Sequence, residues 1–166
     1  MQIVGDELQR LALATYDPLN FDLLGRSAFN RYYYATFLIT RKTLSIMQSH
    51  WKGTAHAEIP NLLEKALRKP VLTQLRNQMR QGLIDEGDKS RILTNINAAG
   101  YELAQLLRNA YHARILADYE PEIPLMKQDD MIMLDSYKLT TAREWPNRAE
   151  ILCKRLLKSW KEAGLA

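Results

Sequence analysis

The chain contains few residues that break helices, and few that form disulfides or bind metals. Its 166 residues include seven glycines, six prolines and one cysteine. The scarcity of glycine and proline favours helices with short connections. The lone Cys153 cannot form an internal disulfide, which is compatible with a reducing cytoplasm, and its leucine neighbours indicate a buried packing thiol. No Cys/His cluster has the spacing of zinc ligands, so we expect no metal and no cofactor.

Long apolar runs and the signatures of several catalytic classes are also absent. No segment has the length needed to cross a bilayer, and residues 1–7 lack the basic start and apolar run of a signal peptide. We therefore expect a cytoplasmic protein with no membrane partner. The sequence has no glycine-rich phosphate loop, no Ser/His/Asp order and no paired-carboxylate motif, which argues against the enzymes that use them.

The composition is that of an ordinary globular protein, with 46% hydrophobic and 25% charged residues. A chain of this length fits one domain with a substantial core, so we expect a single domain over residues 1–166. The net charge of +4 permits an anionic partner such as RNA but does not require one.

Apolar residues recur at helical spacing along the chain, and no stretch of useful length alternates like a strand. This pattern predicts an all-α bundle of five or six helices, in which residues 20–50 and 88–117 form the two longest helices and pack antiparallel. The expected helices cover residues 3–16, 20–50, 57–69, 71–81, 88–118 and 131–163, with a surface loop over 120–130. Gly82 should cap the fourth helix, Asp88 should begin the fifth, and Pro146 should break or kink the last. A sheet of three or more strands would contradict this prediction.

The helix over residues 20–50 has apolar residues on two sides. One side, with Ala28 and Tyr32, is expected to face the core, while the opposite side carries Tyr34, Phe37 and Leu44. A helix of this kind is either sandwiched between neighbouring elements or buried in a dimer interface. We expect a homodimer that buries part of the Tyr34/Phe37 stripe, with the same patch used by both copies.

Arg108 and His112 lie four residues apart in the helix over residues 88–118, which places both on one face. Leu103, Leu106 and Ala110 point almost the opposite way, toward the core. A guanidinium beside an imidazole can stabilise a phosphate and exchange protons near neutral pH. Such pairs are also common on solvated helix faces, so a functional and a structural interpretation both stay open.

Two segments resemble the HEPN superfamily of prokaryotic helical domains. Residues 26–37 read R-S-A-F-N-R-Y-Y-Y-A-T-F and resemble the family's helix R-S-A-x-x-R-x-Y-Y-A-x-F. Residues 114–119 read R-I-L-A-D-Y and resemble the ending R-x-x-A-D-Y of the long helix in one branch of the family. The resemblance covers about residues 5–120, and the helix over 131–163 is expected to close the bundle.

Arg108 and Asn109, followed by His112, are similar to the superfamily's Arg-polar-x-x-x-His ribonuclease motif. Three residues separate Arg108 from His112, whereas the family nucleases have at least four. One residue corresponds to about 100° of helix, so the imidazole would point in a different direction.

The resemblance implies a compact helical bundle that dimerises. In nuclease members of the family, Arg and His from two protomers meet in a cleft and cut RNA without metal. By this resemblance Arg108 would bind the scissile phosphate, Asn109 would orient the site, and His112 would act as general acid and base on the ribose 2′-hydroxyl. The further residues expected to contact RNA or a nucleotide are Arg26, Asn30, Tyr34, Arg41, Arg114 and Tyr119.

Two functions are therefore open. The first is a metal-independent endoribonuclease of a prokaryotic defence or toxin–antitoxin system, which contacts RNA or a nucleotide through the face of Arg108 and His112. The second is a catalytically silent helical partner of a nucleotidyltransferase or another defence component encoded nearby. A nucleotidyltransferase-like protein encoded next to this chain would favour the second function.

Overall fold

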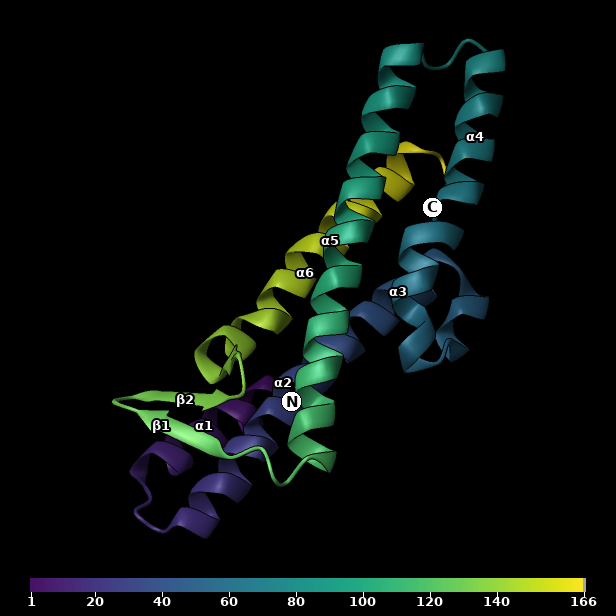
Figure 1. Cartoon of the computed structure of the whole chain (residues 1–166). Coiled ribbons are helices and arrows are strands. Elements are labelled where there is room, and N and C mark those ends of the chain that lie inside the picture. The colour runs from purple at the N-terminus through teal and green to yellow at the C-terminus, as the bar shows by residue number, and fades with distance from the viewer. Residues whose placement is uncertain (166) are drawn as a thin grey trace. The chain divides into compact units, whose positions relative to one another are not determined.

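The computed structural model describes residues 1–165, and helices account for 79% of the chain (Figure 1). The helices are α1 (Gln2–Ala14), α2 (Pro18–Met47), α3 (Ile59–Asn61), α4 (Arg68–Arg80), α5 (Glu86–Tyr119) and α6 (Leu139–Glu162). Two 3-10 segments, Ser49–Gly53 and His56–Glu58, and a π-helical turn at Leu62–Ala66 lie between α2 and α4 in the sequence. The expected helical bundle is confirmed as the fold class, and α2 and α5, with 30 and 34 residues, are its two longest helices, although a small three-stranded sheet accompanies it.

The chain divides into two compact units, and neither unit is a continuous segment. Unit 1 comprises Met1–Leu38 and Leu107–Arg148, and unit 2 comprises Ile39–Leu106 and Ala149–Ala166. The boundary between the units falls within helices α2, α5 and α6, so each of these helices has one part in unit 1 and another in unit 2. Unit 1 carries 9 Lys and Arg against 11 Asp and Glu, whereas unit 2 carries 14 against 8. The positive net charge of the chain therefore resides in unit 2, and the single domain over residues 1–166 stays a prediction.

In unit 1 the first part of α2 packs antiparallel on the last part of α5. The rings of Tyr33 and Tyr111 lie 5.9 Å apart between centroids. Earlier on α2, the guanidinium of Arg26 reaches the carbonyl oxygen of Leu116, later on α5, at 3.1 Å. A residue earlier on α2 thus contacts a residue later on α5, so the two helices run in opposite directions. This confirms the predicted antiparallel packing for this unit.

Tyr32 joins α1 to α2. Its side chain is fully buried, and a Cβ at Gly5 of α1 would lie only 2.7 Å from the Tyr32 ring, so this close approach depends on a glycine. The hydroxyl of Tyr32 lies 3.0 Å from the carboxylate of Asp6 and 2.9 Å from the side-chain oxygen of Gln9. Burial, followed by the contact with Asp6, raises the pKa of Tyr32 well above its ordinary value. The hydroxyl therefore stays protonated and donates a hydrogen bond to α1.

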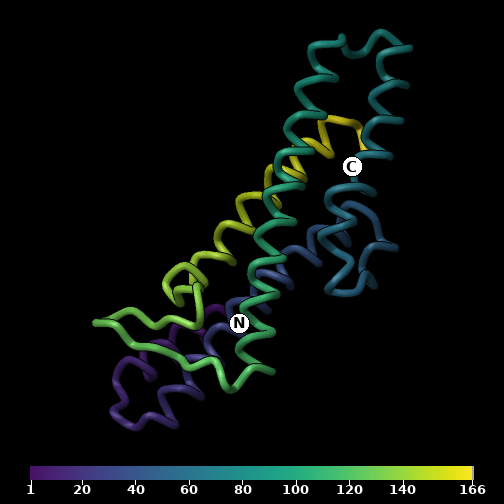
Figure 2. Tube along the Cα trace, in the orientation of Figure 1, coloured from purple at the N-terminus to yellow at the C-terminus, as the bar shows by residue number. Residues whose placement is uncertain are grey.

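A small antiparallel sheet in unit 1 corrects three expectations. Its strands are β1 (Leu125–Gln128), β2 (Met131–Leu134) and β3 (Tyr137–Lys138), paired in that order. The predicted loop over 120–130 is wrong where β1 lies, the predicted helix begins at Leu139 instead of residue 131, and the expectation that no three-stranded sheet would form is wrong. The first hairpin is plain in the green part of the trace (Figure 2).

The sheet forms because aspartates occupy both of its tight turns. Asp129 and Asp135 have φ angles of 53° and 51°, in the left-handed region that Asp tolerates better than most residues. Between the turns Ile132 and Leu134 are buried while their neighbours on β2 are only half-buried, which is the alternation of a strand. The strands are too short for this period to stand out in the sequence.

The two-sided apolar pattern of α2 results from packing within the chain. Phe37, in unit 1, is 3% exposed, and Leu44, in unit 2, is fully buried. The sandwiched alternative is therefore confirmed for these two residues. Phe37 cannot contribute area to a dimer interface, because its side chain is already covered in the single chain.

In unit 2 the core lies between the segment that contains α3 and α4, the first part of α5 and the last part of α6. Its buried residues include Leu63, Leu67, Val71, Leu75, Ile92, Ile96, Leu103 and Leu156. The rings of Trp51 and Trp160 meet edge to face, with centroids 5.8 Å apart. Cys153 is buried in this core, and burial raises the pKa of its thiol, so the predicted packing role is confirmed.

The turn between α4 and α5 confirms one predicted cap and corrects the other. The amide of Gly82 donates to the carbonyl of Met79 and the amide of Leu83 to that of Gln78, and Gly82 has a φ of 70°. This is the Schellman arrangement that favours glycine after a helix. Helix α5 begins earlier than predicted, because the carboxylate of Asp85 accepts the amide of Asp88 at 2.8 Å and serves as the N-cap.

Helix α6 begins at Leu139 and continues through Pro146 without ending there. A break at this proline is therefore wrong, while a kink there stays a prediction. Within residues 1–165, no helix combines the length and the apolar character needed to cross a membrane.

Gly100 allows α5 to pass close to the π-helical turn in unit 2. A Cβ at this position would lie 2.8 Å from the backbone oxygen of Leu63, which cannot move aside as a flexible side chain can. We predict that Gly100→Ala lowers the free energy of unfolding by about 1–3 kcal/mol, as overpacking of a core typically does. Urea denaturation measures this change.

Gly53→Ala provides the control, since an added Cβ at Gly53 meets nothing within 4 Å. Its free energy of unfolding should change by no more than about 0.5 kcal/mol. A Gly100→Ala protein as stable as the wild type would contradict the close packing described here.

Candidate functional site

Arg26 ends α5 and fixes the chain that follows it in unit 1. The side chain is buried, and its Nη1 atom donates to the carbonyl oxygens of Leu116 at 3.1 Å and Glu120 at 3.3 Å. Its Nη2 atom donates to the carbonyl of Ile123, and its Nε to the carboxylate of Asp22 at 2.8 Å. The last carbonyls of a helix have no partner within the helix, and a planar guanidinium can satisfy several of them at once. Arg26 therefore acts as the C-terminal cap of α5.

The second contact between the two family-like segments is made by Asp118. The side-chain amide of Asn30, on α2, donates to Asp118, and the guanidinium of Arg114 forms an ion pair with the same carboxylate at 2.7 Å. Arg114 also lies over the ring of Tyr119, 5.2 Å from its centroid. The residues that resemble the family motifs thus hold α2 and α5 together.

Four residues predicted to contact RNA lie at this network, and three of them are less exposed than Tyr119. Asn30, Tyr34 and Arg114 are half-buried, and Tyr34 is close enough to Arg114 to interact with its charge. Tyr119, in contrast, is 62% exposed and offers an aromatic ring to solvent. Of the aromatic side chains predicted to contact RNA, Tyr119 is the one best placed to meet a base.

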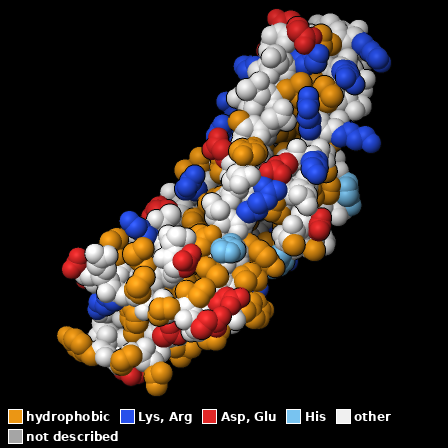
Figure 3. Space-filling model, viewed as in Figure 1, with side chains coloured by type: hydrophobic (Ala, Val, Ile, Leu, Met, Phe, Trp, Pro, Cys, Tyr) orange, Lys and Arg blue, Asp and Glu red, His pale blue; other side chains and the backbone are white. Residues whose placement is uncertain are grey.

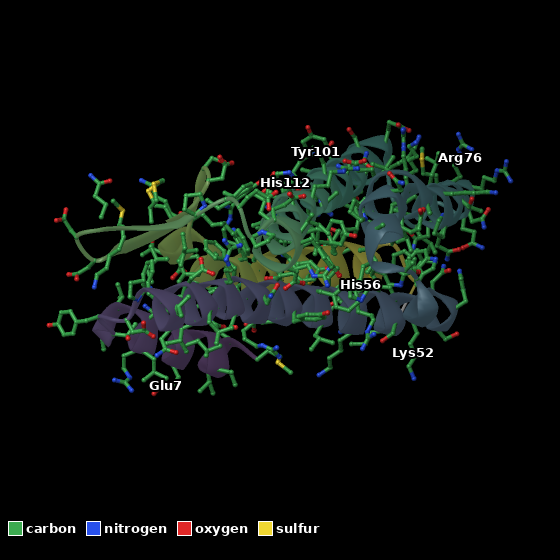
Figure 4. All side chains as sticks on the ribbon, turned by 60° about the horizontal axis from the view of Figure 1, so that its bottom comes forward. Glu7, Lys52, His56, Arg76, Tyr101 and His112 are labelled. Atoms are coloured by element: carbon green, nitrogen blue, oxygen red, sulfur yellow. The ribbon has the colours of Figure 1, made fainter. Side chains whose placement is uncertain are left out.

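His112 is exposed on α5 and hydrogen-bonds to a residue of the sheet. Its Nδ1 atom lies 3.0 Å from the hydroxyl of Tyr137, and the two rings are 5.8 Å apart between centroids. The side chain is labelled in Figure 4, on the outer side of α5. Because Nδ1 is engaged by Tyr137, Nε2 is the ring nitrogen left to meet a ligand.

The β2–β3 turn adds a negative charge near the imidazole. The pKa of Asp135 is lowered, first by the backbone amide and hydroxyl of Ser136 and then by the charge of His112. Burial, together with the charge of Asp135, raises the pKa of Tyr137. The Tyr137 hydroxyl therefore stays protonated near neutral pH, and it can either donate a hydrogen bond to Nδ1 or accept one from the Nδ1–H group. Either arrangement orients the ring, and the Nε2 atom can then act as an acid or as a base.

Arg108 and Asn109 precede His112 on the same helix. Arg108 is half-buried and makes contacts within the chain, while Asn109 is exposed. The residues expected on the opposite face, Leu103, Leu106 and Ala110, are all buried, which confirms the orientation of α5.

The structure brings most, but not all, of the predicted residues into one unit. Unit 1 contains Arg26, Asn30, Tyr34, Arg108, Asn109, His112, Arg114 and Tyr119. Arg41 is exposed and belongs to unit 2. Tyr137 and Asp135 were missed by the sequence reasoning, because their segment was assigned to a helix. The Asp-Ser pair before Tyr137 is the one signal that could have indicated a turn there.

Among residues 1–165, no group of three or more His, Cys, Asp or Glu side chains is arranged to hold a metal ion. The functional side chains at the site are the imidazole of His112, the guanidinium of Arg108 and the phenol of Tyr137. These groups can bind a phosphate and transfer protons.

Arg26 should be important for stability. We predict that Arg26→Ala lowers the free energy of unfolding by about 3 kcal/mol or more, since each buried carbonyl left without a donor costs about 1–3 kcal/mol. Arg26→Lys should recover only a small part, because an ammonium cannot reproduce the planar fork. Chemical denaturation followed by circular dichroism gives both values.

Arg31→Ala is the matched control on α2. The guanidinium of Arg31 lies 3.9 Å from the sulfur of Met1, which makes a weak hydrogen bond at best. The stability lost in this variant should be clearly smaller than that in Arg26→Ala. Equal losses for the two variants would show that the capping contacts contribute little.

Comparison of the chain with protein-family models, with curated proteins and with solved structures gives no match. The resemblance to the HEPN superfamily consequently rests on the motifs in residues 26–37, 108–112 and 114–119.

Proposed function

We propose that the chain is a HEPN-like, RNA-interacting protein of a prokaryotic defence or toxin–antitoxin system, and that it cuts RNA without a metal ion. The observation that carries the proposal is the contact of 3.0 Å between Nδ1 of His112 and the hydroxyl of Tyr137. An exposed imidazole held by a second side chain is the arrangement that general acid–base catalysis requires. Arg108, one helical turn earlier, adds a charge suited to a phosphate.

The proposed reaction is an internal transfer within the RNA. Nε2 of His112 accepts the proton of a ribose 2′-hydroxyl, and the 2′-oxygen forms a bond to the adjacent phosphorus. The bond between phosphorus and the 5′-oxygen breaks, and the leaving 5′-oxygen takes up the proton that Nε2 of His112 accepted, so the imidazole returns to its neutral form. The products are a 2′,3′-cyclic phosphate and a 5′-hydroxyl, so no water, metal or redox partner is consumed.

The other residues have supporting roles in this proposal. Arg108 binds the phosphate and offsets the charge that develops on it, while Asn109 orients the site. Tyr137 is a positioning residue, since it acts through His112. Tyr119 offers its exposed ring for stacking on a base. Arg26 has no part in RNA binding, because its guanidinium is used to cap α5.

Cleavage of single-stranded RNA in the presence of EDTA tests this function. We expect the wild type to produce 2′,3′-cyclic phosphate ends and His112→Ala to lose activity by about 100-fold or more, the usual contribution of a general acid or base. Arg108→Ala should lose at least as much. Tyr137→Phe keeps the ring and removes the hydroxyl, so its loss should be smaller and should be accompanied by a changed dependence of the rate on pH.

His56→Ala is the control for the removal of an exposed imidazole, because His56 lies on a 3-10 segment of unit 2. It should cleave like the wild type. Full cleavage by the double variant Arg108→Ala/His112→Ala would show that this face is not the active site. Absence of cleavage by the wild type, alone or with a protein encoded next to it, would leave the binding-partner function.

A catalytically silent binding partner is the second candidate, and exposed apolar residues favour it. They lie on α1, in the turn after it and at the start of α2, and we call Ile3, Leu11, Tyr16, Leu19 and Leu23 the N-terminal apolar surface. Leu19 is 81% and Ile3 83% exposed. Figure 3 shows orange side chains over the lower part of the molecule, where β1, β2 and the start of α2 lie. Several large apolar side chains exposed together are typical of a surface that binds another protein.

The expected homodimer would use this surface in place of Phe37. At high micromolar concentration, light scattering should give about twice the chain mass of 19.2 kDa. The double variant Leu19→Glu/Leu23→Glu should be monomeric, because it places charges in the apolar contact. Ile46→Glu changes a residue on α2 that is 63% exposed in unit 2, and it should stay dimeric. A monomeric wild type would contradict the homodimer.

A further inference from the structure

Positive charge is concentrated on the exposed side of α4, in unit 2. This helix carries Arg68, Lys69, Arg76 and Arg80 and contains no acidic residue. At about 100° per residue, Lys69, Arg76 and Arg80 fall within about 40° of one another around the helix axis. We call these three residues the α4 cation stripe. All three are exposed, and the side chain of Arg76 extends from the helix into solvent in Figure 4.

The two buried apolar residues of α4 lie on the other side of the helix, while Leu72 and Met79 are half-buried and flank the stripe. Val71 and Leu75 are fully buried in the core of unit 2. The exposed residues next to the stripe are uncharged and polar, namely Thr73 and Asn77. Hydroxyl and amide groups of this kind commonly donate hydrogen bonds to phosphate oxygens and sugars.

The stripe residues have no acidic partner in the described part of the chain. None of the ion pairs within residues 1–165 involves Lys69, Arg76 or Arg80. The lysines of α6 differ, since Lys154 pairs with Glu150 at 2.7 Å and Lys158 lies 3.9 Å from Glu162. The charge of the α4 cation stripe is therefore available to an external anion.

The length of the stripe fits a repeating anion. Lys69 and Arg80 are eleven residues apart, so the stripe is about 16 Å long at about 1.5 Å per residue. A nucleic-acid strand carries one phosphate per about 3.4 Å of helix axis, so this length spans about five phosphates. Three cations in a row can each meet a different phosphate of one strand.

We propose that the α4 cation stripe binds the sugar–phosphate backbone of a nucleic acid, without sequence preference. A membrane surface is the weaker alternative, because helices that lie on membranes expose apolar side chains beside their cations, whereas no large apolar side chain of Arg68–Arg80 is exposed. The proposal goes beyond the cluster around His112, which lies in the more acidic unit 1. The α4 stripe supplies binding that does not depend on cleavage.

Fluorescence anisotropy in the background of His112→Ala tests the proposal, so that bound RNA is not cut at the proposed site. The probes are single-stranded RNA and single-stranded DNA of equal length and sequence, titrated at several salt concentrations. The stripe variant is Lys69→Gln/Arg76→Gln/Arg80→Gln. The control variant, Lys154→Gln/Lys158→Gln/Lys161→Gln, makes the same change of net charge on α6 of the same unit.

We expect the stripe variant to bind both probes about tenfold or more weakly. The plot of the logarithm of its binding constant against the logarithm of salt concentration should be less steep by about 2, because each phosphate that is no longer neutralised removes about 0.7 from the slope. The control should bind less than about threefold more weakly than the wild type. Equal losses for both variants, or no loss for the stripe variant, would overturn the proposal. Stripe-dependent binding to phosphatidylserine vesicles with unchanged RNA and DNA binding would assign the surface to a membrane.

The two proposals fail separately. The binding assay uses a variant that lacks His112, so its outcome does not depend on catalysis. The cleavage assay reports on His112 and Arg108, whatever the stripe binds. Circular dichroism of both triple variants should match the wild type, because all six positions are exposed.

Discussion

The buried guanidinium of Arg26 is the interaction on which the arrangement of unit 1 depends. It donates to carbonyl oxygens at the end of α5 and to carbonyls of the chain that follows, so it ends the helix and sets the direction of residues 120–124. An arginine can do this because its donors form a rigid planar fork. The residues that resemble the HEPN family thus have a structural role whether or not the protein cuts RNA.

The position of β1–β3 follows from this cap, and the candidate site follows from the sheet. The chain leaves α5 toward β1, which packs so close to α2 that a Cβ at Gly25 would meet Leu125. Two aspartate turns then bring Tyr137 beside His112. The imidazole is therefore oriented by a residue from a different element, and this second contact separates it from an ordinary exposed histidine.

The two units differ in their balance of charged residues and in the side chains that they expose. Unit 1 holds the imidazole, the exposed Tyr119 and the N-terminal apolar surface, and it carries slightly more acidic than basic residues. Unit 2 holds the α4 cation stripe and all of the excess basic charge, with 14 basic residues against 8 acidic ones. The net charge of the chain is only +4, but basic residues are concentrated on α4, where they favour an anionic partner.

The sequence by itself determined the helical class, the two longest helices and the face of α5 that is buried, because long apolar periods are local signals. It also determined the cap at Gly82, since only a few residues accept a positive φ. Tertiary structure decided the rest. The burial of Phe37, the use of Arg26 as a cap and the contact of Tyr137 with His112 all join residues distant in the sequence, and spacing along one helix carries no information about such partners.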